Sequence, residues 1–250
     1  MPGNEPDIRK VLTAEVGDDQ DDTWLEVFSI FVHDIESPLA SIKYLLKIME
    51  DGRLDLRKPL HQRMVRSSRI ALERAESIIY DIMAVARAGS AGLPVSNVVL
   101  DPIPLIKEAV EMVAASAEDR DIEIKLALPD QPVKVHADPK LLPRVLDNLL
   151  YNSLRHTPSG RAVTVCLEEN DDRLFVHIKD DGSGLGDIDP ARLFEKYGQL
   201  QMRSEGKHRG VGLGLYFCKL AMTGMGGTVI AADHDDGGAV FSVRLKKAEE

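Results

Sequence analysis

The sequence predicts an α+β protein in two parts, a helical hairpin followed by a two-layer α/β sandwich. Two stretches within the first 90 residues repeat apolar side chains at an alternating spacing of three and four, which indicates helices with an apolar seam. After residue 97 short apolar runs alternate with amphipathic stretches, which indicates strands mixed with helices. The length of 250 residues exceeds one typical domain of about 100–150 residues, so two modest domains are expected.

The composition is that of a globular chain with a real core. Hydrophobic residues make up 44% and charged residues 29% of the sequence. No apolar run approaches the roughly 20 residues of a membrane span, and the amino terminus lacks a signal-peptide pattern, so we expect a cytoplasmic protein. The formal net charge of −10 disfavours nucleic acid as a partner, because polyanions attract clustered positive charge.

The first part is predicted to be two helices joined by a short break. Residues 1–23 are interpreted as a flexible acidic lead, after which the first seam begins. The segment Asp51-Gly52-Arg53 ends the first helix, and a second seam follows. The seam positions are Leu25, Phe28, Val32, Ile35, Leu39, Ile42, Leu46 and Met49 in the first helix and Leu60, Met64, Ser68, Ala71, Ala75, Ile78, Ile82 and Val85 in the second.

One hairpin cannot cover both seams together with the apolar residues beside them. The flanking residues are Ile30, Phe31, Leu45, Ile79 and Met83. Pairing with a second copy into a four-helix bundle would bury them all. The sequence therefore predicts a homodimer that forms through residues 24–88.

The second part follows a linker. Residues 89–97, GSAGLPVSN, are rich in Gly, Ser and Pro, and residues 98–247 then form the second domain. We expect its helices to cover one face of a largely antiparallel sheet. Strands are expected near 97–100, 121–128, 133–136, 161–168, 173–180, 227–232 and 239–245, and helices near 102–118, 139–156 and 211–225.

His33 is the candidate nucleophile of the helical part. It follows the seam residue Val32, so its heptad position points away from the helix pair, with Ser37 one turn further along the same face. A neutral imidazole can attack phosphorus, and the adjacent Asp34 could hold or deprotonate the other ring nitrogen. An exposed histidine on a helix is more often a plain surface residue, so this segment alone does not decide the matter.

Two amides and a guanidinium share one face of the helix expected near 139–156. Asn148 and Asn152 are one turn apart and lie on the same face as Arg155. Amide oxygens suit Mg²⁺ that also binds water and phosphate, while Arg155 would bring positive charge to a phosphate. A polar helix face that carries no site explains this segment equally well.

Asp180 ends a predicted strand and is followed by Gly182, Gly184 and Gly186. A carboxylate at that position can accept the exocyclic amine of adenine, and glycines let the backbone approach a flat ligand closely. Glycine-rich turns are common, so this segment is a weak signal when taken alone.

A second glycine cluster opens the helix expected near 211–225, where free N–H groups and the helix dipole favour phosphate. The polar loop ahead of it, 186–209, carries its own cations and is typical of a lid. No GxxxxGK[ST] segment occurs and neither glycine cluster opens a βαβ unit, so Walker and Rossmann sites are excluded. The nucleotide-binding candidates of this region are Lys207, Arg209, Gly210, Gly212 and Gly214.

Taken in order, these segments resemble the motif boxes of sensor histidine kinases, whose catalytic domain is a GHKL ATPase of the Bergerat fold. The resemblance covers about residues 24–247, and five boxes in the right order are far more specific than any one of them. The boxes are the phosphoacceptor box at 33–39, the asparagine box at 148–157, the glycine boxes at 180–185 and 210–215, and the phenylalanine box at 194–197.

The resemblance implies ATP and Mg²⁺ as ligands, and transfer of the γ-phosphoryl group to His33 with Asp34 as base or orienter. The next acceptor would be an aspartate in the receiver domain of a response regulator. The resemblance also implies that Asn152 coordinates Mg²⁺ with Asn148 as its companion, and that Arg155 contacts phosphate. Asp180 would bind adenine, and the glycines of both glycine boxes would be the hinges of a lid.

Two departures from the family pattern leave alternatives open. Ser37 stands where kinases that also dephosphorylate their regulator often carry Thr or Asn, so phosphatase activity depends on whether its hydroxyl holds a water. No input domain is apparent ahead of the hairpin, so we expect either a catalytic fragment or a signal that arrives through an upstream sensor protein or the amino-terminal segment. The competing functions are a serine kinase of the same superfamily, which would lack the hairpin, and a non-catalytic dimeric scaffold or histidine phosphotransfer protein with a degenerate ATP site.

Overall fold

The structure, a computed structural model, describes residues 21–88, 92–196, 213–234 and 236–248, without the side chains of residues 21–31, 33, 34 and 37. In these ranges no helix is long and apolar enough to cross a membrane. The elements are α2 (Asp21–Glu50), α3 (Pro59–Ala88), β1 (Val98–Leu100), α4 (Pro102–Asp119), β2 (Glu123–Ala127), β3 (Val135–Ala137), α5 (Leu141–His156), β4 (Ala162–Asn170), β5 (Arg173–Asp180), the 3₁₀ helix η1 (Arg192–Phe194), α7 (Leu213–Gly224), β6 (Thr228–Asp233) and β7 (Ala239–Lys247).

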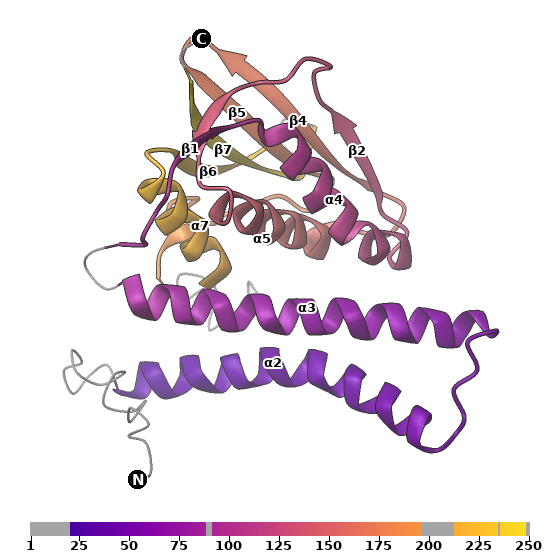
Figure 1. Ribbon diagram of the computed structural model, residues 1–250. Helices are drawn as coiled ribbons and strands as arrows, with labels where there is room; N and C mark the ends of the chain where they lie inside the picture. Colours follow the sequence, from indigo (N-terminus) through magenta and orange to yellow (C-terminus); the bar gives the residue numbers. More distant parts are fainter. Residues whose placement is uncertain (1–20, 89–91, 197–212, 235, 249–250) are drawn as a thin grey trace.

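The hairpin consists of α2 and α3, which lie side by side (Figure 1). Its two helices match the two predicted seams, although α2 begins at Asp21, within the acidic segment that the sequence pattern assigned to a flexible lead. Midway along the pair, the hydroxyl of Ser68 donates to the carbonyl oxygen of Ser41 at 3.3 Å. The small seam residue Ser68 therefore lets the two helices approach closely.

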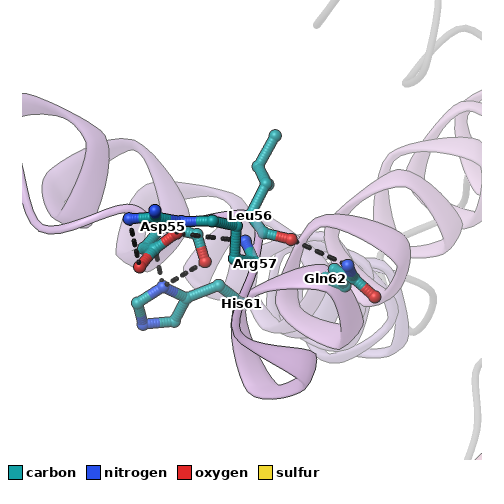
Figure 2. Close-up of polar contacts among 5 residues, drawn as sticks. All are labelled: Asp55, Leu56, Arg57, His61 and Gln62. Carbon is teal, nitrogen blue, oxygen red and sulfur yellow. Dashed lines mark hydrogen bonds and ion pairs between the residues drawn. The ribbon is translucent and has the colours of Figure 1, made fainter.

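The loop that joins α2 to α3 is closed by polar contacts (Figure 2). Nδ1 of His61 accepts from the amide of Asp55 at 2.9 Å, and Nε2 of Gln62 donates to the carbonyl oxygen of Leu56 at 2.7 Å. Arg57 Nε donates to Oδ1 of Asp55 at 3.0 Å, and this guanidinium lowers the pKa of the Asp55 carboxyl below its usual value. The first turn of α3 is thus tied to the loop that precedes it.

The hairpin leaves most of its large apolar side chains exposed. Among its described side chains, the buried apolar residues are Pro38, Ile48, Ala75 and Ala88. Exposed apolar side chains favour association with another helical surface. The four-helix bundle of two copies therefore stays a prediction. The exposed large apolar residues of the hairpin are Val32, Leu39, Tyr44, Leu46, Met49, Leu56, Leu60, Val65, Leu72, Ile79, Tyr80 and Met83.

The second part is a seven-stranded sheet covered on one face by α4, α5 and α7. The strand order is β1-β3-β7-β5-β4-β2, and β6 pairs with β7 beside β3. All pairs are antiparallel except β2 with β4. Every predicted strand and helix is present within a few residues, and the short η1 appears in addition inside the loop expected at 186–209.

The core lies between the sheet and the three helices. On β5 the side chains of Leu174, Val176 and Ile178 alternate inward and are fully buried. On α5 the apolar residues recur at helical spacing, and Leu142 and Leu149 are fully buried against the same core. The opposite, polar face of α5 is therefore turned toward α3, which lies between α2 and the helical layer (Figure 1).

Candidate nucleotide site

Asp180 is buried by the register of its own strand. It continues the inward series of β5 as the last residue of that strand and is only 3% exposed. Its Oδ1 accepts from the backbone amides of Gly182 at 3.0 Å and Ala239 at 3.2 Å. Burial raises the pKa of Asp180, and these two donors oppose that shift. The result is a fixed carboxylate at the edge of the core, as an adenine site requires.

The turn after Asp180 is packed too tightly for side chains. A Cβ at Gly182 would lie 2.6 Å from Oδ1 of Asp180 and 2.8 Å from the carbonyl oxygen of His156, and a Cβ at Gly184 would lie 2.5 Å from Oδ1 of Asp233. That same Asp233 oxygen accepts from the amide of Leu185. The glycines of the first glycine box therefore hold the backbone against its neighbours rather than merely permitting a turn.

The turn between β6 and β7 supports the same strand end from the other side. Gly238 has φ +84°, and a Cβ there would lie 1.8 Å from the carbonyl oxygen of Asp180. Ala239 follows directly and supplies one of the two amides that reach the Asp180 carboxylate. The adenine candidate is thus held between two turns that are more than 50 residues apart in the chain.

The predicted amide face forms on α5. Asp138 starts this helix by accepting from the amides of Lys140 at 2.8 Å and Leu141 at 3.1 Å. Asn148 and Asn152 are both half-buried on its polar face, one turn apart. A Cβ at Gly214, at the start of α7, would lie 2.5 Å from Oδ1 of Asn148. The structure therefore brings Asn148 together with Gly214 of the second glycine box.

A carboxylate of the hairpin also reaches this face. Asp81, 4% exposed, accepts from Nδ2 of Asn148 at 3.2 Å and pairs with Nη2 of Arg144 at 3.4 Å. The same Arg144 donates to the carbonyl oxygen of Ser77 at 3.1 Å and lies 3.6 Å from the ring centroid of Tyr80. Burial raises the pKa of Asp81 to about 6, because desolvation outweighs the stabilising contacts with Arg144 and Asn148.

Arg155 lies at the boundary between the hairpin and the second domain. Its side chain is exposed and lines a cavity of about 430 Å³ that is also lined by Pro38 and Ser41 of α2. Arg120 donates to the carbonyl oxygens of Leu154 and Arg155 and so closes the carboxyl-terminal end of α5. The structure therefore places the third member of the predicted face beside the hairpin.

Several predicted residues are only partly covered by the structure or lie outside it. The backbone of α2 includes His33, Asp34 and Ser37, whose side chains are outside the described residues. Inside the loop expected as a lid, η1 is described and buries Leu193 and Phe194. The predicted residues Lys207, Arg209, Gly210 and Gly212 lie outside the described residues.

Known proteins resemble this chain in its second part and along most of its length. Residues 137–249 match the family of histidine kinase-, DNA gyrase B-, and HSP90-like ATPases. The hybrid signal transduction histidine kinase D of Dictyostelium discoideum is 30% identical over 90% of this chain, and the sensor histidine kinase WalK of Bacillus subtilis is 23% identical over 87%. The chain is therefore similar to sensor histidine kinases along most of its length, and its second part matches the ATPase domain that they share. It spans only 15% and 36% of those two relatives.

Solved structures of histidine kinases share the fold of this chain. AdeS of Acinetobacter baumannii superposes with a TM-score of 0.57 at 16% identity and covers 87% of this chain and 98% of its own. ShkA in complex with AMPPNP gives a TM-score of 0.60 at 22% identity and covers 90% of this chain and 46% of its own. At these identities the likeness establishes the fold alone, an α/β ATPase domain with helices ahead of it.

The residues of this site fit an adenine nucleotide and a metal ion that is held mainly by phosphate and water. The Asp180 carboxylate lies beside the close-packed turn at Gly182, and a carboxylate can accept the exocyclic amine of adenine. In the described part of the chain, no group of three or more His, Cys, Asp or Glu side chains could hold a metal ion. Mg²⁺ would then draw on Asn152, phosphate oxygens and water, which is the mixed coordination it prefers.

Sequence reasoning missed three residues of this region. Gly238 stands in a Gly-Gly pair after a predicted strand, which signalled a turn but not its contact with Asp180. Asp233 ends β6, and no local pattern linked it to the glycine turn near 182–186. Asp81 lies beside the seam of its helix, and no pattern in the sequence indicated that the docked domain buries it.

Proposed function

We propose that this chain is an ATP-dependent protein-histidine autokinase that phosphorylates His33 and passes the phosphoryl group to an aspartate of a response regulator receiver domain. One observation carries the proposal. An ATPase-family domain packs its asparagine face against the same hairpin whose first helix carries His33. The candidate nucleotide site and the candidate phosphoacceptor are therefore parts of one molecule.

In this proposal the nucleotide is held from its base to its phosphates. Asp180 accepts the exocyclic amine of adenine, while the glycine turn that follows lies along the base. Asn152 is the protein ligand of Mg²⁺, which neutralises phosphate charge, and Asn148 and Arg155 act beside it. The predicted phosphate contacts at the second glycine box are Lys207, Arg209, Gly210, Gly212 and Gly214.

The transfer itself is a displacement at the γ-phosphorus. A ring nitrogen of His33 forms the new P–N bond while the bond to the bridging oxygen breaks, and ADP leaves with that electron pair. Asp34 holds the proton of the other ring nitrogen and accepts it as positive charge develops. In the second step the P–N bond breaks and the receiver aspartate forms an acyl phosphate. Ser37 lies one turn from the histidine, where its hydroxyl could position a water for dephosphorylation.

The proposed organisation assigns separate tasks to the parts of the chain. Residues 24–88 form the dimerising and phosphoacceptor domain, 89–97 the linker and 98–247 the ATP-binding domain. The exposed apolar residues of the hairpin support a homodimer, and an upstream sensor protein and a receiver domain are the expected further partners in a cytoplasmic pathway. The fixed Asp180 carboxylate and the close-packed glycine turn argue against a scaffold with a degenerate ATP site.

The decisive experiment is incubation with radiolabelled ATP and Mg²⁺. The chain should become labelled with a phosphate that is labile in acid and stable in alkali, and His33→Gln should abolish the label while leaving nucleotide binding intact. His61→Gln is the matched control, because His61 lies in the same hairpin but is engaged with Asp55 at the loop. Asp180→Asn should lose nucleotide binding, and Asp34→Ala should slow transfer without preventing binding.

Two results would contradict the proposal. Acid-labile label that persists in His33→Gln would show that another residue is the acceptor. A folded chain that binds the nucleotide but incorporates no label, also in the presence of its partner proteins, would favour the scaffold alternative.

A further inference from the structure

The side-chain amide of Asn148 is saturated in the docked arrangement. An asparagine offers two N–H donors and one carbonyl oxygen. Its Nδ2 donates to Oδ2 of Asp81 at 3.2 Å and to the carbonyl oxygen of Arg144 at 3.1 Å, which uses both donors. Asn148 therefore has no N–H left for a phosphate oxygen while Asp81 stays in place.

The carbonyl side of the same amide is also enclosed. The α-carbon of Gly214 packs so closely that a Cβ there would lie 2.5 Å from Oδ1 of Asn148. Gly214 stands in the first turn of α7, directly after the segment predicted as the lid. One asparagine thus contacts the hairpin through its nitrogen and the start of α7 through its oxygen.

Further contacts between the hairpin and the ATP-binding domain surround the Asp81–Asn148 hydrogen bond. Tyr80 meets Phe217 of α7 edge to face, with ring centroids 6.1 Å apart and planes at 81°. Arg144 inserts its guanidinium over the Tyr80 ring and pairs with the buried Asp81. Docking therefore places a carboxylate beside a residue that we assign to the nucleotide site.

We propose that Asp81 competes with the bound nucleotide for Asn148, so that docking of the ATP-binding domain on the hairpin and nucleotide binding oppose each other. The inference rests on the proposed function, in which Asn148 belongs to the ATP site. A nucleotide that engages the Asn148 amide must displace Asp81, and the carboxylate in turn repels nearby phosphates. Linkage is reciprocal. The free energy by which docking weakens nucleotide binding therefore equals the free energy by which nucleotide binding weakens docking.

The first arm of the test measures Mg²⁺-dependent binding of a fluorescent ATP analogue to the full chain. Asp81→Ala frees Asn148, and Tyr80→Ala weakens docking without touching the Asp81–Asn148 pair. Both variants should bind the analogue more tightly than the wild type, by about five- to 100-fold, the usual range of coupling between sites. Glu76→Ala is the matched control, since Glu76 is an exposed acid on the same helix, and it should bind like the wild type.

The second arm measures hydrogen exchange of residues 77–85, the part of α3 under the docked domain. Adding the analogue and Mg²⁺ to the wild type should speed exchange there, because nucleotide binding releases the hairpin. In Asp81→Ala exchange should already be fast and should change little with nucleotide. Melting temperature and near-ultraviolet circular dichroism of each variant verify that the ATP-binding domain is intact.

Failure of the inference differs from failure of the proposed function. If Asp81→Ala and Tyr80→Ala are folded and bind the analogue no more tightly than the wild type, competition is refuted while ATP binding stands. If nucleotide slows exchange at 77–85, docking and binding cooperate and the inference is wrong in sign. If neither the wild type nor any folded variant binds the analogue, and Asp180→Asn makes no difference, the proposed function fails and the inference fails with it.

Discussion

The ATP-binding domain and the hairpin are stabilised in different ways. The domain buries a core between its sheet and three helices, in which Leu149 and Phe217 have no exposed surface. The hairpin instead leaves large apolar side chains such as Leu72 and Met83 nearly half exposed. The domain contains its own source of stability, whereas the hairpin needs surfaces that cover it from outside. The docked domain is one such surface, and a second copy is the one we propose.

This difference has a functional consequence. A region that is stabilised by its contacts can change those contacts at low cost, so the hairpin is suited to switch between partners. A region with a closed core keeps the geometry of its site, so the contacts that hold Asp180 do not depend on how the domain is docked. The polar cluster at Asp81 lies where the two kinds of region meet.

The largest expected effect comes from truncating a core residue of the ATP-binding domain. Leu149→Ala removes a side chain that is 0% exposed and should lower the free energy of unfolding of the domain by about 3–5 kcal/mol, because the site cannot fully collapse. Leu72→Ala, at a residue that is 46% exposed, should leave that free energy unchanged and weaken the dimer instead. Denaturant unfolding measures the first quantity and analytical ultracentrifugation the second.

The comparison fails if Leu72→Ala destabilises the domain as much as Leu149→Ala does. It also fails if the wild type sediments as a monomer at every concentration, since the hairpin would then be stable without the second copy. A dimer that dissociates only in Leu72→Ala would sharpen the comparison by locating the pairing surface on α3.

The next effect tests the turn that supports Asp180. Gly238→Ala should destabilise the ATP-binding domain by about 2–3 kcal/mol, because the new Cβ meets a carbonyl oxygen at a residue with φ +84°. Binding of the ATP analogue should also weaken, since Asp180 must shift. Gly226→Ala is the control, because Gly226 has φ +73° but no atom within 4 Å of an added Cβ.

Gly226→Ala should therefore cost only about 1 kcal/mol and leave nucleotide binding unchanged. Equal losses of stability in the two variants would mean that backbone strain alone, and not contact with Asp180, explains the glycine at 238. Thermal unfolding in parallel with titration of the analogue separates these outcomes.

The sequence predicted the parts of the molecule that depend on local periodicity. The apolar seams predicted both hairpin helices. The alternation of apolar and polar residues along β5 predicted the strand that ends at Asp180. The polar face with Asn148 and Asn152 followed from helical spacing on α5. Each of these features repeats within a few residues, so a single sequence contains enough information to find it.

The contacts between distant segments could not be predicted in this way. Asp81 is 63 residues from Arg144 in the chain and lies off the seam of its own helix, so its spacing resembles that of a solvated residue. Its burial is a product of docking, which no pattern within α3 encodes. Gly238 likewise approaches Asp180 only because β5 and β7 pair, and that pairing is a property of the whole sheet.

The smallest expected effect is a dependence of docking on pH. In the docked arrangement burial raises the pKa of Asp81 to about 6, and in an undocked hairpin the carboxyl should return toward its ordinary value of 3.8. The docked state then binds the proton more tightly, so this contribution to docking is fully present below about pH 4 and is lost as pH rises through about 6. Raising the pH from 5 to 7 should weaken docking by about 1.4 kcal/mol, or tenfold.

Two charged groups of α5 face Asp81 and shift its pKa in opposite directions. Arg144 lowers its pKa, whereas Asp147 raises it and has a pKa that its own burial raises to about 6. Asp81→Asn is neutral at every pH and should remove the contribution of Asp81, leaving that of Asp147. Hydrogen exchange at 77–85, corrected for the intrinsic pH dependence of exchange, measures the effect. Docking that tightens as pH rises would mean that the ion pair with Arg144 outweighs the desolvation of Asp81. The ionised Asp81 would then stabilise the docked domain instead of weakening its docking.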